Sequence, residues 1–157
     1  MKKALSIVVC ALALFAFTVS SAKAVGPLNF YIRGGIMTPS DFSFSPVFGL
    51  AGANIDFNFG ALSLSPECDL LIYNFTFNPV FIMPGVILNM NLAALYVGAG
   101  VAVPVIIGSG YSLQGDVQFK VNAGLKAGGL KLQAFFITPF NNFFSYTWVG
   151  ATLGAGF

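Results

Sequence analysis

The sequence predicts an all-β protein: an eight-stranded antiparallel up-and-down transmembrane β-barrel, preceded by a cleaved signal peptide. Three observations predict this fold. The chain of 157 residues is 57% hydrophobic and only 8% charged, which is too apolar for an ordinary soluble domain. Several segments alternate between polar and apolar residues, and this period places the two kinds on opposite faces of a strand. The last such segment runs to the C-terminal Phe157, so its edge needs a partner strand, which closure into a barrel supplies.

The N-terminal segment has the composition of a secretory signal peptide. Lys2 and Lys3 precede an apolar core over residues 4–19, and a stretch of small residues follows. Ala22 and Ala24 form an Ala-x-Ala site, which predicts cleavage after Ala24. We therefore expect a signal peptide over residues 1–24 and a single barrel domain over residues 25–157. An uncleaved membrane anchor is the alternative, but the apolar core is short for a membrane-spanning helix.

The segment 113–127 is the clearest predicted strand. Its apolar residues alternate with polar ones at Gln114, Asp116, Gln118, Lys120, Asn122 and Lys126. A helix would spread both sets around its surface, whereas a strand places one set toward lipid and the other toward a barrel interior. The same alternation occurs in the segments 28–33, 54–59 and 62–70. Four separate segments therefore indicate the same architecture.

Eight strands account for the rest of the predicted domain. We expect them over residues 27–37, 47–59, 61–73, 81–91, 94–105, 113–127, 130–138 and 145–157. Tight turns are expected after the second, fourth and sixth strands, and longer connections after the others. In transmembrane barrels the short turns lie on the periplasmic side and the longer loops face outside. A helical membrane protein is the alternative suggested by the uncharged run 92–108, but its glycine, proline and valine residues favour an extended chain.

Nearly all charged side chains of the predicted domain occupy the alternate strand positions that are expected to face the barrel interior. Facing them outward would be costly, because a Lys or Arg in lipid at the membrane midplane costs about 2–4 kcal/mol. The expected lumen charge network comprises Arg33, Asp56, Glu67, Asp69, Asp116, Lys120, Lys126 and Lys131. An eight-stranded barrel is only just wide enough for side chains to fill it, so we expect a plugged interior in which these charges pair. A narrow gated ion path through the same residues is the alternative.

The C-terminal strand carries a family resemblance. Val149, Ala151, Leu153, Ala155 and Phe157 share one face of it. This alternating strand with a terminal aromatic residue resembles the assembly signal of bacterial outer-membrane barrels, and the predicted domain resembles the small OmpA/OmpX-like barrels. The resemblance implies export through the periplasm to the outer membrane of a Gram-negative envelope. It also implies recognition by periplasmic chaperones and the barrel-assembly machinery, and contact with outer-membrane lipid and lipopolysaccharide.

Catalysis, metal binding and cofactor binding are not expected. The chain contains no histidine, and activation of a serine nucleophile usually needs that imidazole. Glu67 and Asp69 share a strand face, but neighbouring cations explain this pair without catalysis. Only Cys68 remains after signal cleavage, which excludes an internal disulfide and leaves one thiol for a metal. The predicted domain has no basic patch for nucleic acid.

Three functional classes remain open. The first is a structural or interaction protein of the outer membrane, with a lumen filled by side chains and phenylalanine-rich loops. The second is transport or binding of a small hydrophobic ligand through the loops and a glycine-lined upper lumen, as OmpW-like barrels are thought to do. The third is a soluble periplasmic lipocalin-like barrel, in which the apolar residues would face inward.

Overall fold

The computed structural model describes residues 27–157, apart from residues 42, 44, 75, 77–79, 109–110 and 145. The predicted signal peptide, including Ala22 and Ala24, lies outside the described residues. No helix in the described ranges is both long enough and apolar enough to span a membrane. The strands are β1 (Leu28–Pro39), β2 (Phe48–Phe59), β3 (Leu62–Tyr73), β4 (Val80–Leu92), β5 (Leu95–Ala102), β6 (Val105–Gly108), β7 (Tyr111–Gln114), β8 (Gln118–Ala127), β9 (Leu130–Pro139) and β10 (Trp148–Gly156).

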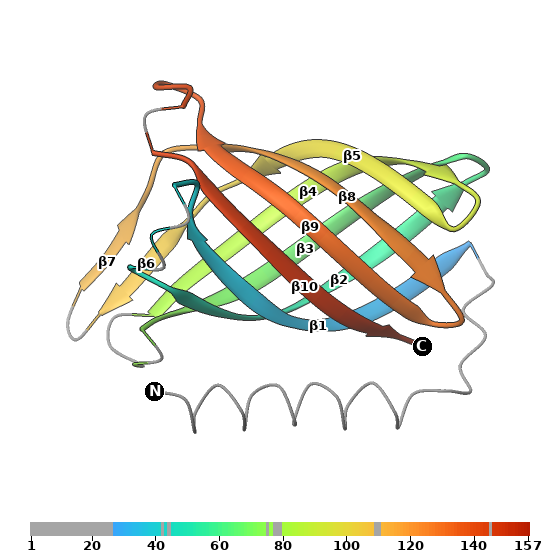
Figure 1. Ribbon diagram of the computed structural model, residues 1–157, viewed down its shortest axis with the longest axis horizontal. Coiled ribbons are helices and arrows are strands. Elements are labelled where there is room, and N and C mark those ends of the chain that lie inside the picture. Colours follow the sequence, from blue (N-terminus) through green and yellow to red (C-terminus); the bar gives the residue numbers. More distant parts are fainter. Residues whose placement is uncertain are drawn as a thin grey trace.

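Antiparallel pairing closes eight of these strands into a barrel (Figure 1), in the order β1, β2, β3, β4, β5, β8, β9 and β10. Strand β10 pairs back with β1, from Gly156 opposite Tyr31 to Trp148 opposite Pro39. The C-terminal strand therefore has a partner on each side, so neither of its edges is left unpaired. The predicted all-β fold, an eight-stranded antiparallel barrel, is confirmed.

The two ends of the barrel differ in their connections. Two-residue turns at residues 60–61, 93–94 and 128–129 lie at the end where β1 begins and β10 finishes, which we call the turn end. Gly128 and Gly129 have φ values of 56° and 86°, which glycine adopts without a Cβ clash and which suit a tight hairpin. At the other end, which we call the loop end, longer connections join β1 to β2, β3 to β4 and β9 to β10.

Side chains alternate between the outer surface and the interior, as the sequence predicts. On β8, Lys120 is 1% exposed and the next residue, Val121, is 39% exposed. Polar residues such as Asn54 and Asn89 are likewise buried, whereas Leu64 and Leu88 are exposed. The barrel thus has an apolar outer surface around a largely polar interior.

Glycines on the inner face leave room for aromatic rings from the neighbouring strand. Three such pairs lie directly opposite each other: Tyr31 and Gly156, Tyr96 and Gly124, and Phe135 and Gly150. A Cβ atom at Gly124 would lie 2.6 Å from the Tyr96 hydroxyl oxygen, and one at Gly150 would lie 2.3 Å from Cζ of Phe135. The rings therefore occupy the space that larger residues at these positions would take.

Two strands that the sequence predicts as continuous are interrupted near the loop end. The predicted strand 94–105 ends as β5 at Ala102 and resumes as β6, while the segment 113–127 is divided between β7 and β8. Pro104 lies at the first break and has no amide hydrogen to donate to a strand ladder. The Gly115 amide donates to the Pro104 carbonyl at 2.7 Å, and a Cβ at Gly115 would lie 2.9 Å from Pro104 Cγ.

These breaks change the course of the wall at the loop end. Strand β6 continues to pair with β4, and β7 pairs with β6, while β8 pairs with β5 and β9. The β6–β7 hairpin consequently extends away from the barrel (Figure 1). The loop expected over residues 106–112 is mostly this hairpin.

Candidate functional site

Four charged side chains meet inside the barrel. We call them the central cluster: Arg33 of β1, Glu67 and Asp69 of β3, and Lys120 of β8. Arg33 Nη2 lies 2.7 Å from Glu67 Oε2 and 2.6 Å from Asp69 Oδ1. Lys120 Nζ lies 2.5 Å from Glu67 Oε1 and 3.3 Å from Asp69 Oδ2. Two cations and two carboxylates thus balance, and each side chain is at most 2% exposed.

Further hydrogen bonds fix the geometry of this cluster. Arg33 Nε donates to Asp69 Oδ1 at 2.9 Å, and Nη1 donates to Gln133 Oε1 at 3.3 Å. The Lys120 ammonium also lies 4.7 Å from the centre of the Phe135 ring. Buried ion pairs are tolerated only when their remaining polar atoms are satisfied in this way.

A second group of charges lies nearer the turn end. This turn-end cluster consists of Asp56 of β2, Lys126 of β8 and Lys131 of β9. Lys131 Nζ donates to both oxygens of the Asp56 carboxylate, at 3.1 and 3.2 Å, and Lys126 Nζ lies 2.8 Å from Asp56 Oδ2. Asn54 and Ser65 also donate to its Oδ1, at 2.6 and 2.7 Å. The carboxylate is therefore fully engaged in a buried position.

Aromatic rings cover the cations of the turn-end cluster. Lys131 Nζ lies 4.9 Å from the centre of the Tyr31 ring and 5.2 Å from that of Tyr96, and Lys126 Nζ lies 4.8 Å from that of Tyr96. The ring faces offset part of the charge that Asp56 does not balance. The aromatic residues opposite Gly124 and Gly156 thus also serve the ionic interior.

The structure does not place Asp116 in either cluster. From the sequence we expected it in the lumen charge network, because it lies an even number of residues from Lys120 in a predicted strand. In the structure it is exposed in the connection between β7 and β8. The assignment is wrong because the break opposite Pro104 lies before Gln118, where β8 begins. Alternation predicts which way a side chain faces only within a continuous strand. The Asp116 carbonyl accepts the Gln118 side-chain amide at 3.1 Å.

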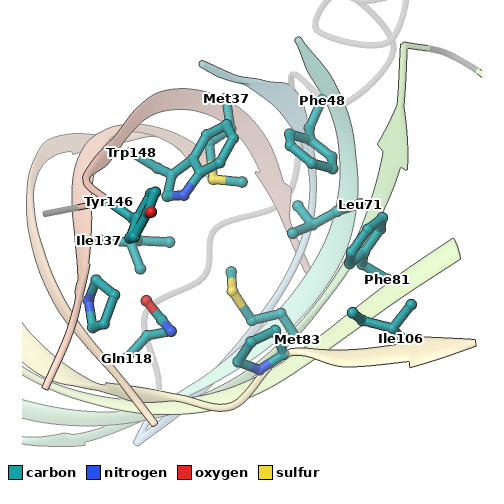
Figure 2. A pocket seen from close by; sticks show the side chains of 12 residues that line it. Met37, Phe48, Leu71, Phe81, Met83, Ile106, Gln118, Ile137, Tyr146 and Trp148 are labelled. Atoms are coloured by element: carbon teal, nitrogen blue, oxygen red, sulfur yellow. The ribbon is translucent and has the colours of Figure 1, made fainter. Parts of the chain in front are cut away.

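The interior lining changes from charged to apolar between the central cluster and the loop end. A cavity of about 220 Å³ lies there (Figure 2). Its buried walls include Met37, Phe48, Leu71, Met83 and Ile137. The rings of Trp148 and Phe81 meet Phe48 edge-on, with ring centres 5.2 and 5.4 Å from it. Pro104, Ile106, Gln118 and Pro139 line the side where the wall is interrupted.

Sequence reasoning expected a glycine-lined upper lumen and missed this apolar wall. A signal was present, because alternation fails toward the loop ends of several strands. Residues 70–72 on β3 and 135–137 on β9 are apolar at every position, which indicates burial on the inner face as well as apolar contact on the outer one.

The predicted assembly-signal residues lie on β10 and just beyond it. Ala151 is exposed, Val149 and Leu153 are partly exposed, and Ala155 is buried. Phe157 donates its amide to the Phe30 carbonyl at 2.9 Å, and the two rings lie 6.4 Å apart. The final residue is thus bonded to the first strand of the barrel.

Three solved bacterial barrels are similar to this chain. Neisserial surface protein A (NspA) is 10% identical, with a TM-score of 0.50, and the alignment covers 82% of this chain and 92% of that one. The N-terminal β-barrel domain of Pseudomonas aeruginosa OprF is 17% identical, with a TM-score of 0.49 and coverage of 82% and 97%. Ail, the attachment invasion locus protein of Yersinia pestis, is 12% identical, with a TM-score of 0.38 and coverage of 82% and 94%.

The sequence matches no protein-family model and no curated protein. The likeness to NspA concerns the fold and agrees with the closed barrel described above. The chain has the eight-stranded architecture of the small OmpA/OmpX-like outer-membrane barrels.

Proposed function

We propose that this protein is an outer-membrane barrel with a structural or interaction role, whose lumen is blocked by side chains at the central cluster and does not conduct. The central cluster carries the proposal. Glu67 and Asp69 are neutralised by Arg33 and Lys120 inside the barrel at 2.5–3.3 Å, and all four side chains are buried. An ion path needs sites that bind a permeating ion weakly enough to release it, whereas these charges bind one another.

The outer surface supports insertion into lipid. Large apolar side chains are exposed around the barrel, among them Leu28, Phe59, Leu88, Leu95 and Leu132. The soluble lipocalin-like alternative needs these residues inside, and exposing so many to water would be unfavourable. By analogy with other transmembrane barrels, the turn end faces the periplasm and the loop end faces outside.

An aromatic group on the outer surface supports the interaction role. Phe140, Phe143 and Phe144 follow β9 and lie beside Phe119 of β8, with ring centres 5.7 to 5.9 Å apart in successive pairs. Phe144 is 75% exposed. Transmembrane barrels carry girdles of aromatic residues at the membrane interfaces, where these rings would meet lipopolysaccharide or a neighbouring protein. We propose no catalytic role, because cations engage both Glu67 and Asp69.

Conductance in planar bilayers tests the sealed lumen. Refolded wild-type protein should give no steady channels. A variant in which all four residues of the central cluster are alanine is the control, and it should conduct if it inserts, because the interior then holds a water-filled gap. Steady wild-type channels would overturn the proposal. Membrane location is tested separately: the protein should stay with the outer-membrane fraction after a carbonate wash, and release into the wash would contradict it.

A further inference from the structure

The apolar cavity at the loop end has no part in sealing the lumen. We propose that it binds a compact, uncharged, apolar molecule about the size of one substituted ring, taken up free rather than as a lipid acyl chain. The inference rests on the proposed membrane barrel, but it does not depend on whether the lumen conducts. Size, charge and access support it in turn.

The size of the cavity limits the ligand. An apolar cavity of about 150 Å³ in another protein accommodates benzene. The present cavity, about 220 Å³, therefore has room for one ring and a small substituent. Met37 and Met83 face this space, and their flexible thioether side chains adapt to irregular shapes. A full lipid acyl chain is longer than this space allows.

The lining excludes an ionic ligand. Among the described lining residues, the polar groups come from Gln118, Tyr146 and the indole of Trp148. The charges of the central cluster are balanced within it, so they leave no counter-charge for a ligand. Transferring an unpaired ion into such surroundings is strongly unfavourable, whereas a neutral apolar molecule gains contacts.

The interrupted wall keeps the cavity open toward the loop end. Pro104 and Ile106 line it from the β5–β6 side of the break, and Gln118 and Pro139 line it from the β8–β9 side. Ile106 and Gln118 are labelled in Figure 2. The Gly115 bond to the Pro104 carbonyl and the Phe140 bond to the Val117 carbonyl hold this shape. Tyr146 is 73% exposed, although it also lines the cavity, so it lies where the cavity meets its surroundings. A ligand would enter past Tyr146.

Trp148 allows a direct test, because it lines the cavity and is the only tryptophan of the chain. The refolded full chain in detergent is titrated with bromobenzene, whose heavy atom quenches indole fluorescence. The expected result is saturable quenching, with 4-bromobenzoate at least tenfold weaker. Ile137→Phe fills the cavity and should weaken the bromobenzene response at least tenfold. Leu64→Phe on the outer face is the matched control and should leave it unchanged.

Two outcomes would overturn the inference. Linear quenching of equal slope in wild type, Ile137→Phe and Leu64→Phe would mean that bromobenzene reaches Trp148 only through the detergent. Quenching by a phospholipid with brominated acyl chains, abolished by Ile137→Phe in bilayers, would assign the cavity to a lipid chain. Met83→Phe replaces Ile137→Phe if the latter does not refold, as judged by its heat-dependent electrophoretic mobility. The planar-bilayer result is independent, so the sealed lumen and this site can fail separately.

Discussion

Arg33 on β1 reaches Asp69 on β3 across the intervening strand β2, with Nη2 2.6 Å from Oδ1. Gly52 lies between them, directly opposite both residues in the two strand registers. A Cβ atom at Gly52 would lie 2.1 Å from Asp69 Oδ1. The absence of a side chain at this position therefore makes room for the ion pair.

Gly52→Ala should disturb this pair. The methyl group would displace the Asp69 carboxylate, and overpacking of this kind costs about 1–3 kcal/mol. We expect the free energy of unfolding, measured by urea titration of refolded protein with Trp148 fluorescence, to fall by that amount. Ala51→Val on the outer face of the same strand is the control, with little change expected. Equal effects of the two substitutions would show that Gly52 has no special relation to the pair.

Lys120→Met should be more damaging, because it leaves Glu67 and Asp69 with Arg33 as their only cation. Removing one partner from a buried ion pair costs about 3–5 kcal/mol. Adding Glu67→Gln restores charge balance, so the double variant should be more stable than Lys120→Met alone. Urea titration measures both. A double variant as unstable as the sum of the two single variants would contradict coupling within the central cluster.

The turn-end cluster should respond asymmetrically. Asp56→Asn leaves Lys126 and Lys131 without an anion, and we expect a loss of about 3–5 kcal/mol in the free energy of unfolding. Lys126→Met leaves the balanced pair of Asp56 and Lys131, and the Lys126 side chain is already 18% exposed. Its effect should therefore stay below about 1 kcal/mol. Comparable losses in the two urea titrations would argue against this charge arrangement.

Ala93→Gly should stabilise the barrel. Ala93 has a φ of 57° in the turn between β4 and β5, a conformation that costs an L-residue roughly 1 kcal/mol and glycine much less. The midpoint of urea unfolding should therefore rise. Ala94→Gly in the same turn is the control, because Ala94 has no positive φ and gains nothing from the change. A gain in both variants, or in neither, would contradict the explanation.

Strand positions and facings could be predicted because each depends on a local period. Lys120 and Val121 face opposite sides for the same reason that any two neighbours in a strand do. The burial of Arg33, Glu67 and Asp69 followed from the cost of placing charge in lipid. These inferences need neither the register of the strands nor the identity of neighbours.

The remaining features depend on register and on breaks in strands. Gly52 and Gly124 gain their roles only from the residues opposite them, Asp69 and Tyr96, which a single sequence does not align. The predicted inward facing of Asp116 was wrong because the wall is interrupted at Pro104, which lies eleven residues before Gly115 in the chain. The loop-end cavity likewise combines residues from strands that are far apart in sequence.

The facing of Cys68 tests the central claim most directly, since this residue is exposed on the outer surface of β3. In bilayers, a bimane label on Cys68 of a Cys10→Ser chain should be quenched by nitroxides on lipid acyl chains and not by iodide. A cysteine at a buried position of the same strand, introduced as Ser63→Cys with Cys68→Ala, should resist labelling in the folded protein. Quenching of the Cys68 label by iodide alone, with ready labelling at residue 63, would contradict a barrel that is apolar outside and sealed within.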